Sequence, residues 1–592
     1  MGFIQTAVSV GVLVLSWRLY QSYVHSREGI KVVSQAKAEY DYIVIGAGSA
    51  GSLVSARLTE IPDITVLVLE AGPNFENIPV LNQPEQWWNN IGGEFDWRYK
   101  TVPQKHACLG SKNNQCAWPR GRIVGGSGSI NALQNTRGSP FDFDGWESQG
   151  CTDWSFNDVL PYFLKLEDMN IEELRSNNFH NVGGPIAVSS GDDSPLAELY
   201  RKAGEEIGFK VISDYNGATQ RSFNKIQINV RNGERSSSAK ELLSGTDRPN
   251  LDILPEAHAT KINFENKRAA GVTFIRDGRK HTARARKEII LSGGTIGSAQ
   301  LLLLSGIGPK QHLNDLGIPV IEDLPVGHNL QDHSQVSMCT SINVPYSMTS
   351  SYVESTLNQL KYKFLNAGPK SMTASEGSAF LHLNQALENT TYPDIQFVFV
   401  SRLIGANIFD YSEDIADLVI EKDSEKHGFC TFVALTHPRA RGVISLSSTD
   451  PFDHPLIDPR YFENHQDVLD LVGGIRIWEK LAQSKTMSDL GVDINELNKR
   501  FCSEHKFRSD DYWECYIRKL AFTQFHPTSS CKMGTLDDES TVVGPDLRVK
   551  GVAGLRVVDA SVFPVITSGN TNTPTLMVAE RAADLILDRK TL

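Results

Sequence analysis

The residues best suited to bind a ligand lie in a glycine-rich turn near the N-terminus. The run 46–51, Gly-Ala-Gly-Ser-Ala-Gly, follows a short apolar run at 42–45 and precedes a stretch with helical apolar spacing. In such a turn the glycines permit a tight bend, close approach of a pyrophosphate and close helix–strand packing, while the helix N-terminus offers amide donors. Glu70 ends the next apolar run, where a carboxylate can accept ribose hydroxyls. The pattern predicts a dinucleotide site at Gly46, Gly48, Ser49, Ala50, Gly51 and Glu70.

This fingerprint alone does not choose between NAD and FAD. A flavin dinucleotide needs a second set of contacts, and the far end of the chain can supply them. A strand-like run at 555–558 ends at Asp559, followed by Ala560, and an amphipathic helix is expected to start near Thr573-Pro574, just after Thr571. A strand that ends in an acid is common in any α/β protein, so both cofactors stay open at this point.

A second loop, 121–131, is dense in glycine and hydroxyl residues and can present many backbone donors to a ligand. The stretch 118–127, Trp-Pro-Arg-Gly-Arg-Ile-Val-Gly-Gly-Ser, resembles the first signature of the glucose-methanol-choline (GMC) oxidoreductases, which are FAD-dependent alcohol oxidases and dehydrogenases. The run 294–308 resembles their second signature. Further matches follow at 325–333, at 437–442 and at 559–564, so the resemblance covers about residues 40–590.

The resemblance implies FAD as cofactor and an α/β (α+β overall) fold. We expect a Rossmann-type FAD-binding domain and a discontinuous antiparallel-sheet substrate-binding domain. The expected segments are an N-terminal targeting segment and linker (1–39), the FAD-binding domain with part of the substrate domain inserted (40–335), the main substrate-binding segment (336–525) and a return to the FAD-binding domain (526–592). In the signature loop, we expect Arg120, Gly125, Gly126, Ser127 and Asn131 to contact the cofactor.

One departure from the family pattern concerns how the cofactor is held. Members that link FAD covalently in this loop have a histidine before the asparagine, whereas this chain has Ile130 before Asn131. Non-covalent FAD is therefore expected. The loop continues with polar Gln134 and Asn135, which can face the flavin or the substrate entry, or form a solvated turn.

The resemblance also implies a catalytic pair. The segment 526–534 resembles the family segment that carries the active-site histidine, and Asn570 falls where relatives have a second histidine or an asparagine. A histidine can accept the hydroxyl proton of an alcohol near neutral pH, and an amide N–H can hold the developing alkoxide. The alternatives are a structural role for His526 and a helix-capping role for Asn570. His333 and His437 are interpreted as loop histidines bound to backbone carbonyls, and Cys531 as buried packing or a reactive thiol.

We therefore expect FAD-dependent oxidation of an alcohol to an aldehyde or ketone. Similarity is greatest to animal members, which include glucose dehydrogenases, choline dehydrogenases and ecdysone oxidases. A hydroxynitrile lyase-type enzyme and a non-catalytic flavin-binding relative are the alternatives. The expected partners are a small alcohol and an electron acceptor, which is oxygen, a quinone or another acceptor.

Composition limits the remaining possibilities. The chain has 592 residues, a formal net charge of −12 and 40% hydrophobic residues, which is typical of a globular protein. A prior of about 150 residues per domain suggests about four domains, but the motifs favour two interleaved ones. No basic stripe points to nucleic acid. The eight cysteines lack metal-ligand spacing, so no metal site is expected, and Cys108 and Cys116 can bridge a short loop.

The N-terminus carries an apolar run at 3–17. It is shorter than a comfortable membrane span and is interpreted first as a signal peptide, with an uncleaved membrane anchor or an apolar end that targets nothing as the alternatives. Either of the first two places the chain in the secretory lumen or outside the cell, where disulfides form. A sequon at Asn389-Thr390-Thr391 is compatible with that compartment.

Overall fold

The computed structural model describes residues 29–75, 78–191, 194–384, 392–494 and 501–590, together with Ser16 and Leu592. The sequon at 389–391 and, apart from Ser16, the apolar run at 3–17 lie outside the described residues. None of the helices within these ranges is both long enough and apolar enough to pass through a bilayer.

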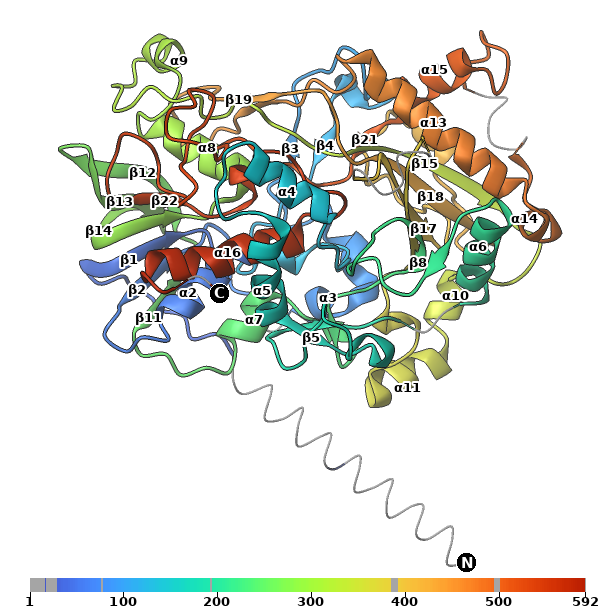
Figure 1. The fold of residues 1–592 in the computed structure, drawn as a ribbon, viewed down its shortest axis with the longest axis horizontal. Coiled ribbons are helices and arrows are strands. Elements are labelled where there is room, and N and C mark those ends of the chain that lie inside the picture. The colour runs from blue at the N-terminus through green and yellow to red at the C-terminus, as the bar shows by residue number, and fades with distance from the viewer. Residues whose placement is uncertain are drawn as a thin grey trace, which may run out of the picture.

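The first of two large sheets carries the glycine-rich turn and lies on the left of Figure 1. Its parallel part is built from apolar runs that are buried, and a hairpin extends it in antiparallel pairing. Strand β22 comes from the other end of the chain and pairs with the end of β14. In spatial order the strands are β11 (Leu251–Leu254), β2 (Val66–Leu69), β1 (Glu39–Ile45), β14 (Arg279–Leu291), β13 (Arg268–Arg276) and β12 (His258–Glu265), with β22 (Leu555–Val557) beside β14.

Two helices from opposite ends of the chain pack against each other beside this sheet. Helix α2 (Ser49–Leu58) follows the glycine turn, and α16 (Asn572–Ile586) lies next to it. The Arg57 side chain of α2 donates to Glu580 of α16 at 2.9 Å. Helix α16 begins one residue before the predicted start, and its N-cap Thr571 makes no side-chain capping bond.

The second large sheet lies on the right of Figure 1 and is antiparallel except for one parallel pair at its edge. Its outer face is covered by α13 (His465–Ala482) and α6 (Pro195–Glu206). In spatial order the strands are β21 (Phe522–Thr523), β15 (Ser334–Ser341), β18 (Gly428–Leu435), β17 (Ile395–Val400), β16 (Ser375–Leu381), β8 (Ser222–Lys225) and β7 (Val211–Ile212). The predicted fold class is confirmed.

The chain passes between the two sheets several times. Strands β7 and β8 of the second sheet precede β11 of the first in sequence, and β22 returns to the first sheet after β21. The segment boundaries at 335/336 and 525/526 stay predictions, but this strand order requires an interleaved arrangement.

The other α-helices and strands are mostly short. The remaining helices are α3 (Pro79–Asn82), α4 (Pro140–Ser148), α5 (Phe156–Leu166), α7 (Ser238–Leu243), α8 (Gly294–Leu304), α9 (Lys310–Asp315), α10 (Ser350–Val353), α11 (Thr356–Leu365), α12 (Glu413–Val419), α14 (Lys485–Asp489) and α15 (Asp510–Leu520). The short strands are β3 (Tyr99–Lys100), β4 (Ala117–Trp118), β5 (Glu167–Met169), β6 (Ile186–Val188), β9 (Val230–Arg231), β10 (Glu234–Arg235), β19 (Val443–Ser445) and β20 (Leu456–Asp458).

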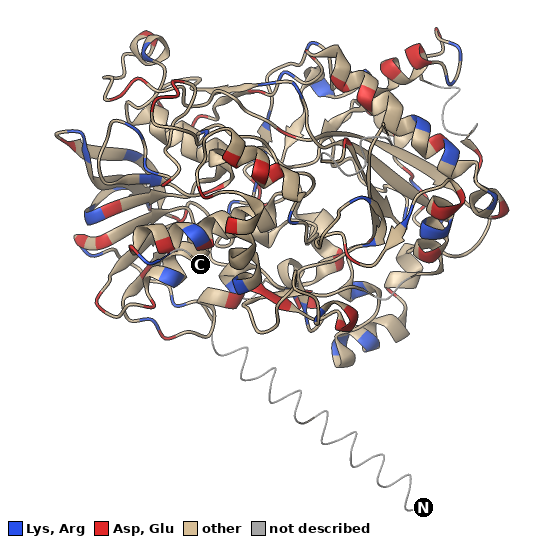
Figure 2. Ribbon diagram, viewed as in Figure 1, with Lys and Arg blue, Asp and Glu red and all other residues tan. Residues whose placement is uncertain are grey.

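Figure 2 shows acidic and basic residues mixed over both halves of the molecule.

Three disulfides join cysteines in the described part of the chain. The predicted pair Cys108–Cys116 is present, whereas the pairs Cys339–Cys430 and Cys502–Cys515 were not predicted. Cys151 and Cys531 are free and buried. Burial raises the pKa of the Cys531 thiol to about 12, which favours the packing interpretation over a reactive thiol.

Candidate active site

A cavity of about 310 Å³ lies between the two sheets, and its described lining residues run from Ile45 near one end of the chain to Thr575 near the other. Its wall includes the ends of β1, β2 and β14 from the first sheet and residues of β15, β16, β17 and β18 from the second. The predicted site residues that line the cavity are Gly46, Gly48, Ser49, Ala50, Glu70, Arg120, Gly126, Ser127, Asn131, His526, Asp559, Ala560, Asn570 and Thr571.

Two predicted cofactor contacts, Gly51 and Gly125, are not part of the cavity wall. A Cβ on Gly51 would lie 1.9 Å from the carbonyl oxygen of Gly46, so this glycine lets α2 pack on the turn. Gly125 has a φ of +94°, and a Cβ there would lie 2.0 Å from Ser129 Oγ. Both positions need glycine for local packing, and their contact with the cofactor stays a prediction.

The two glycine turns touch each other. A Cβ on Gly126 would lie 2.8 Å from the Cα of Gly48, and a Cβ on Gly46 would lie 2.4 Å from the Ser292 carbonyl oxygen. Glycine is therefore required where three segments of backbone converge on the cavity. A flat, amide-rich cradle of this kind fits a dinucleotide.

Three helices begin at the cavity wall. The first residues of α2, of α8 and of α16 all line the cavity, so three sets of N-terminal amides and positive dipole ends point toward one space. Such ends favour phosphate groups and other developing negative charge. This supports the fit of a pyrophosphate-bearing flavin.

The side chain of Glu70 is buried just after the end of β2. Its two oxygens accept hydrogen bonds from the backbone amides of Ala47, at 2.9 Å, and Gly72, at 2.8 Å. Burial raises the Glu70 pKa to about 7, and the two amides oppose that shift. Glu70 thus holds the glycine turn in place and also lines the cavity, where its oxygens can accept further donors.

Asp559 ties the end of the first sheet to the start of α8. One carboxylate oxygen accepts from the Gly294 amide at 2.9 Å and from Ser298 Oγ at 2.6 Å. The other accepts from the Ser561 amide at 2.8 Å. Burial raises the Asp559 pKa. The second signature motif and the C-terminal contact set are therefore joined through this one side chain.

His526 and Asn570 meet at the other part of the cavity. Nδ2 of Asn570 lies 3.1 Å from Nε2 of His526. Oδ1 of Asn570 accepts from Thr136 Oγ1 and from Gln396 Nε2, each at 3.4 Å. These two donors fix the amide so that Nδ2 donates toward His526. Asn570 is therefore not the helix cap, because that position belongs to Thr571.

This arrangement sets the tautomer of His526. Because Nε2 faces an amide donor, it carries the lone pair, and the proton lies on Nδ1, which is 3.0 Å from Nδ1 of His333. Burial lowers the pKa of His526 well below its usual value, and His333 and Arg120 add to the shift. Burial likewise lowers the His333 pKa to about 3. Both imidazoles are therefore neutral near neutral pH.

Asp332 and Tyr461 hold the backbone of His526, a role that sequence reasoning missed. The His526 amide donates to Asp332 Oδ1 at 2.9 Å, and the Tyr461 hydroxyl donates to Asp332 Oδ2. Burial raises the Asp332 pKa to about 6. Asp332 lies in the matched motif 325–333, which was the available signal, but the motif does not indicate its partner.

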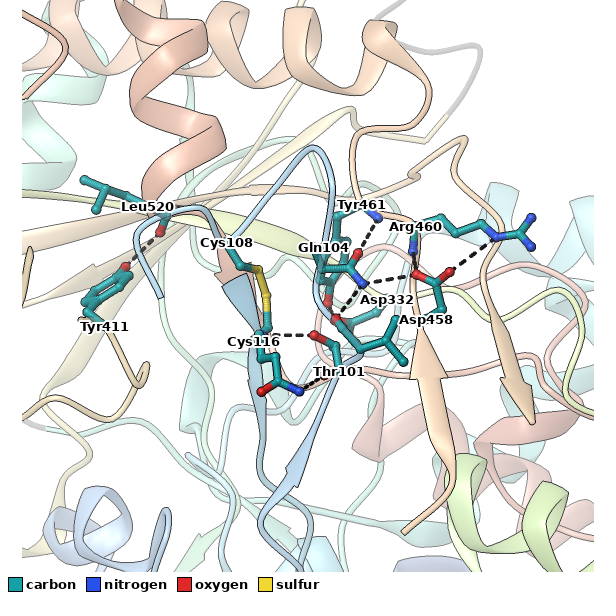
Figure 3. Close-up of a disulfide and its surroundings, with 12 residues drawn as sticks. Thr101, Gln104, Cys108, Cys116, Asp332, Tyr411, Asp458, Arg460, Tyr461 and Leu520 are labelled. Atoms are coloured by element: carbon teal, nitrogen blue, oxygen red, sulfur yellow. Dashed lines mark hydrogen bonds and ion pairs between the residues drawn. A yellow bond between two sulfur atoms is a disulfide. The ribbon is translucent and has the colours of Figure 1, made fainter. Parts of the chain in front are cut away.

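A disulfide-closed hairpin supports Tyr461 in turn (Figure 3). The Tyr461 amide donates to Gln104 Oε1 at 3.3 Å. In the sequence, Gln104 lies between Thr101 and Cys108, and both of these residues are tied to Cys116. Thr101 Oγ1 accepts from the Cys116 amide at 3.0 Å, and Cys108 forms the disulfide with Cys116. The bridge therefore fixes a loop that reaches His526 through Tyr461 and Asp332.

Two loop histidines singled out in the sequence also have side-chain partners. His333 contacts His526 as well as backbone groups of Thr436 and Thr567, and His437 Nε2 lies 3.0 Å from Asp142 Oδ1. A backbone-carbonyl partner for His437 stays a prediction. Gln134 lines the cavity, and Asn135 Oδ1 accepts from Thr573 Oγ1 at 2.8 Å, so neither belongs to a solvated turn.

Comparison with solved structures supports the same fold over nearly the whole chain. Pyridoxine 4-oxidase from Mesorbium loti superposes with a TM-score of 0.79 at 26% identity, covering 93% of this chain and 100% of that one. A variant of the formate oxidase from Aspergillus oryzae gives a TM-score of 0.83 at 26% identity, covering 94% of this chain and 99% of that one.

Curated relatives are similar over the same range. Glucose dehydrogenase [FAD, quinone] of Drosophila melanogaster is 37% identical over 93% of this chain and 87% of its own length. Alcohol dehydrogenase [acceptor] of Pseudomonas putida is 35% identical over 93% and 96%, and mitochondrial choline dehydrogenase of Mus musculus is 33% identical over 94% and 90%. The GMC oxidoreductase family matches residues 40–335 with its N-terminal part and 438–579 with its C-terminal part. The chain therefore belongs to the GMC oxidoreductase family.

Proposed function

We propose that His526 and Asn570 form the catalytic pair of this enzyme. The enzyme is an FAD-dependent oxidoreductase that acts on the CH–OH group of an alcohol. The observation that carries the assignment is the 3.1 Å contact between Asn570 Nδ2 and the unprotonated Nε2 of His526 inside the shared cavity. When bound, FAD supplies the acceptor for the hydride that leaves the alcohol carbon.

His526 removes the hydroxyl proton of the substrate at Nε2. The lowered pKa keeps this nitrogen unprotonated at neutral pH, so the base is ready before substrate enters. Asn570 Nδ2 donates to the oxygen as it becomes an alkoxide, and it cannot compete for the proton because an amide is not basic. Thr136 and Gln396 keep the amide in this orientation.

The first sheet and its helix ends hold the cofactor. Gly46, Gly48, Ser49 and Ala50 at the start of α2 would bind the pyrophosphate, and Glu70 the ribose hydroxyls. The second loop and the C-terminal contact set would bind the rest through Arg120, Gly126, Ser127, Asn131, Asp559, Ala560, Asn570 and Thr571. Since Ile130 stands at the position that a covalent link would need, FAD is non-covalent and dissociable.

The experiment is anaerobic addition of alcohols to the purified holoenzyme while the visible absorbance of the flavin is recorded. Bleaching by an alcohol supports the proposal. Cleavage of a cyanohydrin without any bleaching by primary, secondary or steroid alcohols would instead establish a lyase. None of the relatives named above is a lyase, and the presence of both His526 and Asn570 argues against a non-catalytic flavin binder.

We also infer delivery to the secretory pathway. Three disulfides support an oxidising compartment, and the apolar run at 3–17 would act as signal peptide or uncleaved anchor. The partner that reoxidises the flavin is oxygen, a quinone or another acceptor, and reoxidation rates with each would identify it. N-terminal sequencing of the secreted or membrane-bound protein tests the delivery to the secretory pathway. A cytosolic protein with reduced cysteines would overturn that inference.

A further inference from the structure

We propose that Arg235 supplies the counter-charge of the FAD pyrophosphate and directs the amide of Asn131 toward it. The inference rests on the proposed function, since it takes the wall around Gly48 and Ser49 as the pyrophosphate site, and it assigns Asn131 to the same site. Arg235 ends β10 and stands behind the wall of the main cavity. It is a positioning residue, because it acts on the cavity through Asn131.

Arg235 is buried without an acidic partner. Its side chain is 2% exposed. Nε donates to the Leu81 carbonyl at 2.8 Å, and Nη1 donates to Asn131 Oδ1 at 2.6 Å and to the Gly128 carbonyl at 3.3 Å. Nη2 has no hydrogen-bond partner in the described structure. Burial lowers the pKa of Arg235 to about 9, and no carboxylate in the described part of the chain opposes that shift.

The other arginines that are buried in the described structure each have a compensating partner. Two pair with carboxylates at 2.8 and 2.6 Å, and the third lies 4.7 Å from the centroid of a tryptophan ring. A buried guanidinium without a counter-charge is unfavourable, because it has lost its water and gained no charge in return. An anionic ligand would offset that cost at Arg235. The compensated pairs are Arg137–Glu167, Arg556–Glu288 and Arg581–Trp154.

Arg235 lies behind the part of the wall where the two glycine turns meet. A Cβ on Gly128 would lie 2.6 Å from Ser49 Oγ, and Gly128 is the residue whose carbonyl accepts from Arg235. A small cavity of about 10 Å³ is lined by Arg235 and shares Ser49 and Asn131 with the main cavity. Ser49 is the first residue of α2, where free amides and the helix dipole favour phosphate. The charge of Arg235 and the positive end of α2 therefore act on the same place.

Asn131 connects Arg235 to the main cavity. Its Oδ1 accepts from Arg235 at 2.6 Å and from the Leu133 amide at 3.0 Å, so the oxygen end of the amide is held from behind. Nδ2 donates to none of the described residues and stays accessible, and Asn131 lines the cavity. The end of this amide that a ligand can reach is therefore the N–H donor, which suits a phosphate oxygen.

The charge of FAD identifies the group that this arrangement fits. The oxidised flavin ring and the adenosine are neutral near pH 7, whereas the pyrophosphate is anionic. An uncompensated cation and a directed N–H donor beside the α2 terminus therefore suit the pyrophosphate. A purely structural role for Arg235, in which it only joins Leu81, Gly128 and Asn131, would not distinguish charged from neutral ligands.

The first experiment compares ADP with adenosine, which differ only in the two phosphate groups. Calorimetry on the full-length chain, freed of flavin by dialysis, gives both dissociation constants. Arg235→Met should weaken ADP binding by roughly 10- to 100-fold, the range for hydrogen bonds to charged groups, and change adenosine binding by less than about twofold. Arg231→Met is the matched control and should change neither, because Arg231 already pairs with Asp168 at 2.7 Å and with Glu241 at 3.2 Å.

Two results with Arg235→Met would overturn the inference. Equal losses for ADP and adenosine would show that Arg235 only shapes the loop, and unchanged ADP binding would exclude any role at this site. If the melting temperature shows that Arg235→Met does not fold, Arg235→Gln gives the same comparison. It is also neutral, and its amide can still donate to the Leu81 or the Gly128 carbonyl.

Arg235→Lys separates the charge from the hydrogen bonds. Lysine keeps the positive charge but lacks the planar fork that reaches three acceptors. We therefore expect this variant to keep most of the preference for ADP over adenosine. A preference as low as that of Arg235→Met would exclude the counter-charge.

The second experiment tests whether Arg235 acts through Asn131. Asn131→Leu removes the directed donor and should weaken ADP binding in the parent chain. In the Arg235→Met background, the same substitution should weaken ADP binding several-fold less, because the amide is no longer held. If the two losses simply multiply in the double variant, the orienting role is overturned.

These outcomes are separable from the proposed reaction. If the parent chain binds ADP no better than adenosine, the inference falls together with the proposed pyrophosphate contacts of α2, and flavin bleaching by alcohols still decides the role of His526. If no alcohol bleaches the flavin, alcohol oxidation by His526 fails. In that case the ADP and adenosine affinities still decide the role of Arg235.

Discussion

The amide nitrogen of Asn570 faces the unprotonated ring nitrogen of His526 across 3.1 Å. The two residues lie 44 positions apart, His526 on the loop after β21 and Asn570 on the loop before α16. The amide is fixed by Thr136 and Gln396, the imidazole contacts His333, and the His526 backbone amide donates to Asp332. A proton acceptor and a hydrogen-bond donor are thereby directed at one small region before any substrate is present.

Replacing the base should separate cofactor binding from chemistry. His526→Gln is expected to retain FAD but to slow flavin reduction by about 10²- to 10⁴-fold, the usual contribution of a general base. Stopped-flow reduction under anaerobic conditions measures this. His465→Gln, an exposed histidine paired with Glu514, is the control and should reduce at the normal rate. Normal reduction by His526→Gln would remove this residue from the mechanism.

Asn570 should matter for the alkoxide and little for stability. Asn570→Leu is expected to slow flavin reduction by about 10²- to 10³-fold, as when a donor to a developing oxyanion is lost. Asn570→His should keep more activity, because its ring can also donate to the oxygen. The melting temperature of both variants should stay close to that of the parent. A large fall in melting temperature with an unchanged rate in the surviving holoenzyme would contradict the assignment.

Glu70 should control how tightly FAD is kept. Glu70→Ala removes the acceptor for the Ala47 and Gly72 amides and the proposed ribose contact, so we expect FAD affinity to fall by at least about tenfold. Glu70→Gln should fall in between, because its amide retains one acceptor oxygen. The ratio of bound flavin to protein after dialysis measures this, with the partly exposed Glu60→Ala as control. Full occupancy in Glu70→Ala would exclude the ribose assignment.

The buried histidines should make the protein sensitive to acid. Their pKa values are lowered in the folded state, so below pH about 6.5 the unfolded chain takes up protons that the folded protein does not. Above that pH the two histidines are neutral in both states, so the protein has its full stability. As the pH falls below it, the free energy of unfolding decreases. Each histidine costs up to about 1.4 kcal/mol per pH unit in this range.

Burial raises the pKa of Glu70 and Asp332, so between their unfolded and folded pKa values these two groups make stability rise as the pH falls. Comparing the parent with His526→Gln, which share both carboxyl groups, therefore isolates the contribution of the histidine. Between pH 6.5 and 5, the free energy of unfolding measured with denaturant should fall more steeply for the parent than for His526→Gln. This range lies just below the ordinary histidine pKa of about 6.5. Parallel pH profiles of the two proteins would show that His526 is not held neutral.

The Cys108–Cys116 bridge should affect catalysis as well as stability. Cys108→Ser with Cys116→Ser frees the hairpin that supports Tyr461, Asp332 and the His526 backbone, so we expect a several-fold lower kcat and a loss of about 2 kcal/mol in stability. The paired substitutions Cys502→Ser and Cys515→Ser are the control. They should also lower stability but leave kcat unchanged, since that bridge lies on α15 and the segment before it. Equal kcat in both double variants would break the proposed connection.

Local motifs predicted much of this site. The glycine turn, Glu70, the signature loop, Asp559, His526 and Asn570 were identifiable because each lies in a short run whose residue types and order carry the chemistry. Gly51 and Gly125 were assigned as cofactor contacts because a motif records where glycine is required but not whether the requirement comes from a ligand or from packing.

The supporting contacts could not be predicted in the same way. Tyr461 and Asp332 are 129 residues apart, and Gln396 and Asn570 are 174 apart. Such pairs depend on how the second sheet is folded onto the first, and no periodicity within one segment records that. The second-sheet wall of the cavity is the extreme case, because its side chains come one at a time from separate strands and loops of residues 335–525.

The hydrogen bond between Ser49 Oγ and Asn572 Oδ1, at 2.7 Å, joins positions 523 residues apart. At typical synthesis rates, the ribosome needs about half a minute to two minutes to add that length. For most of that time α2 can pack against α7 but lacks its second partner helix, α16, so the nascent chain presents an incomplete FAD site and leaves uncovered the side of α2 that α16 later buries. Chaperone contacts during biosynthesis should therefore concentrate on the first sheet and end when α16 emerges.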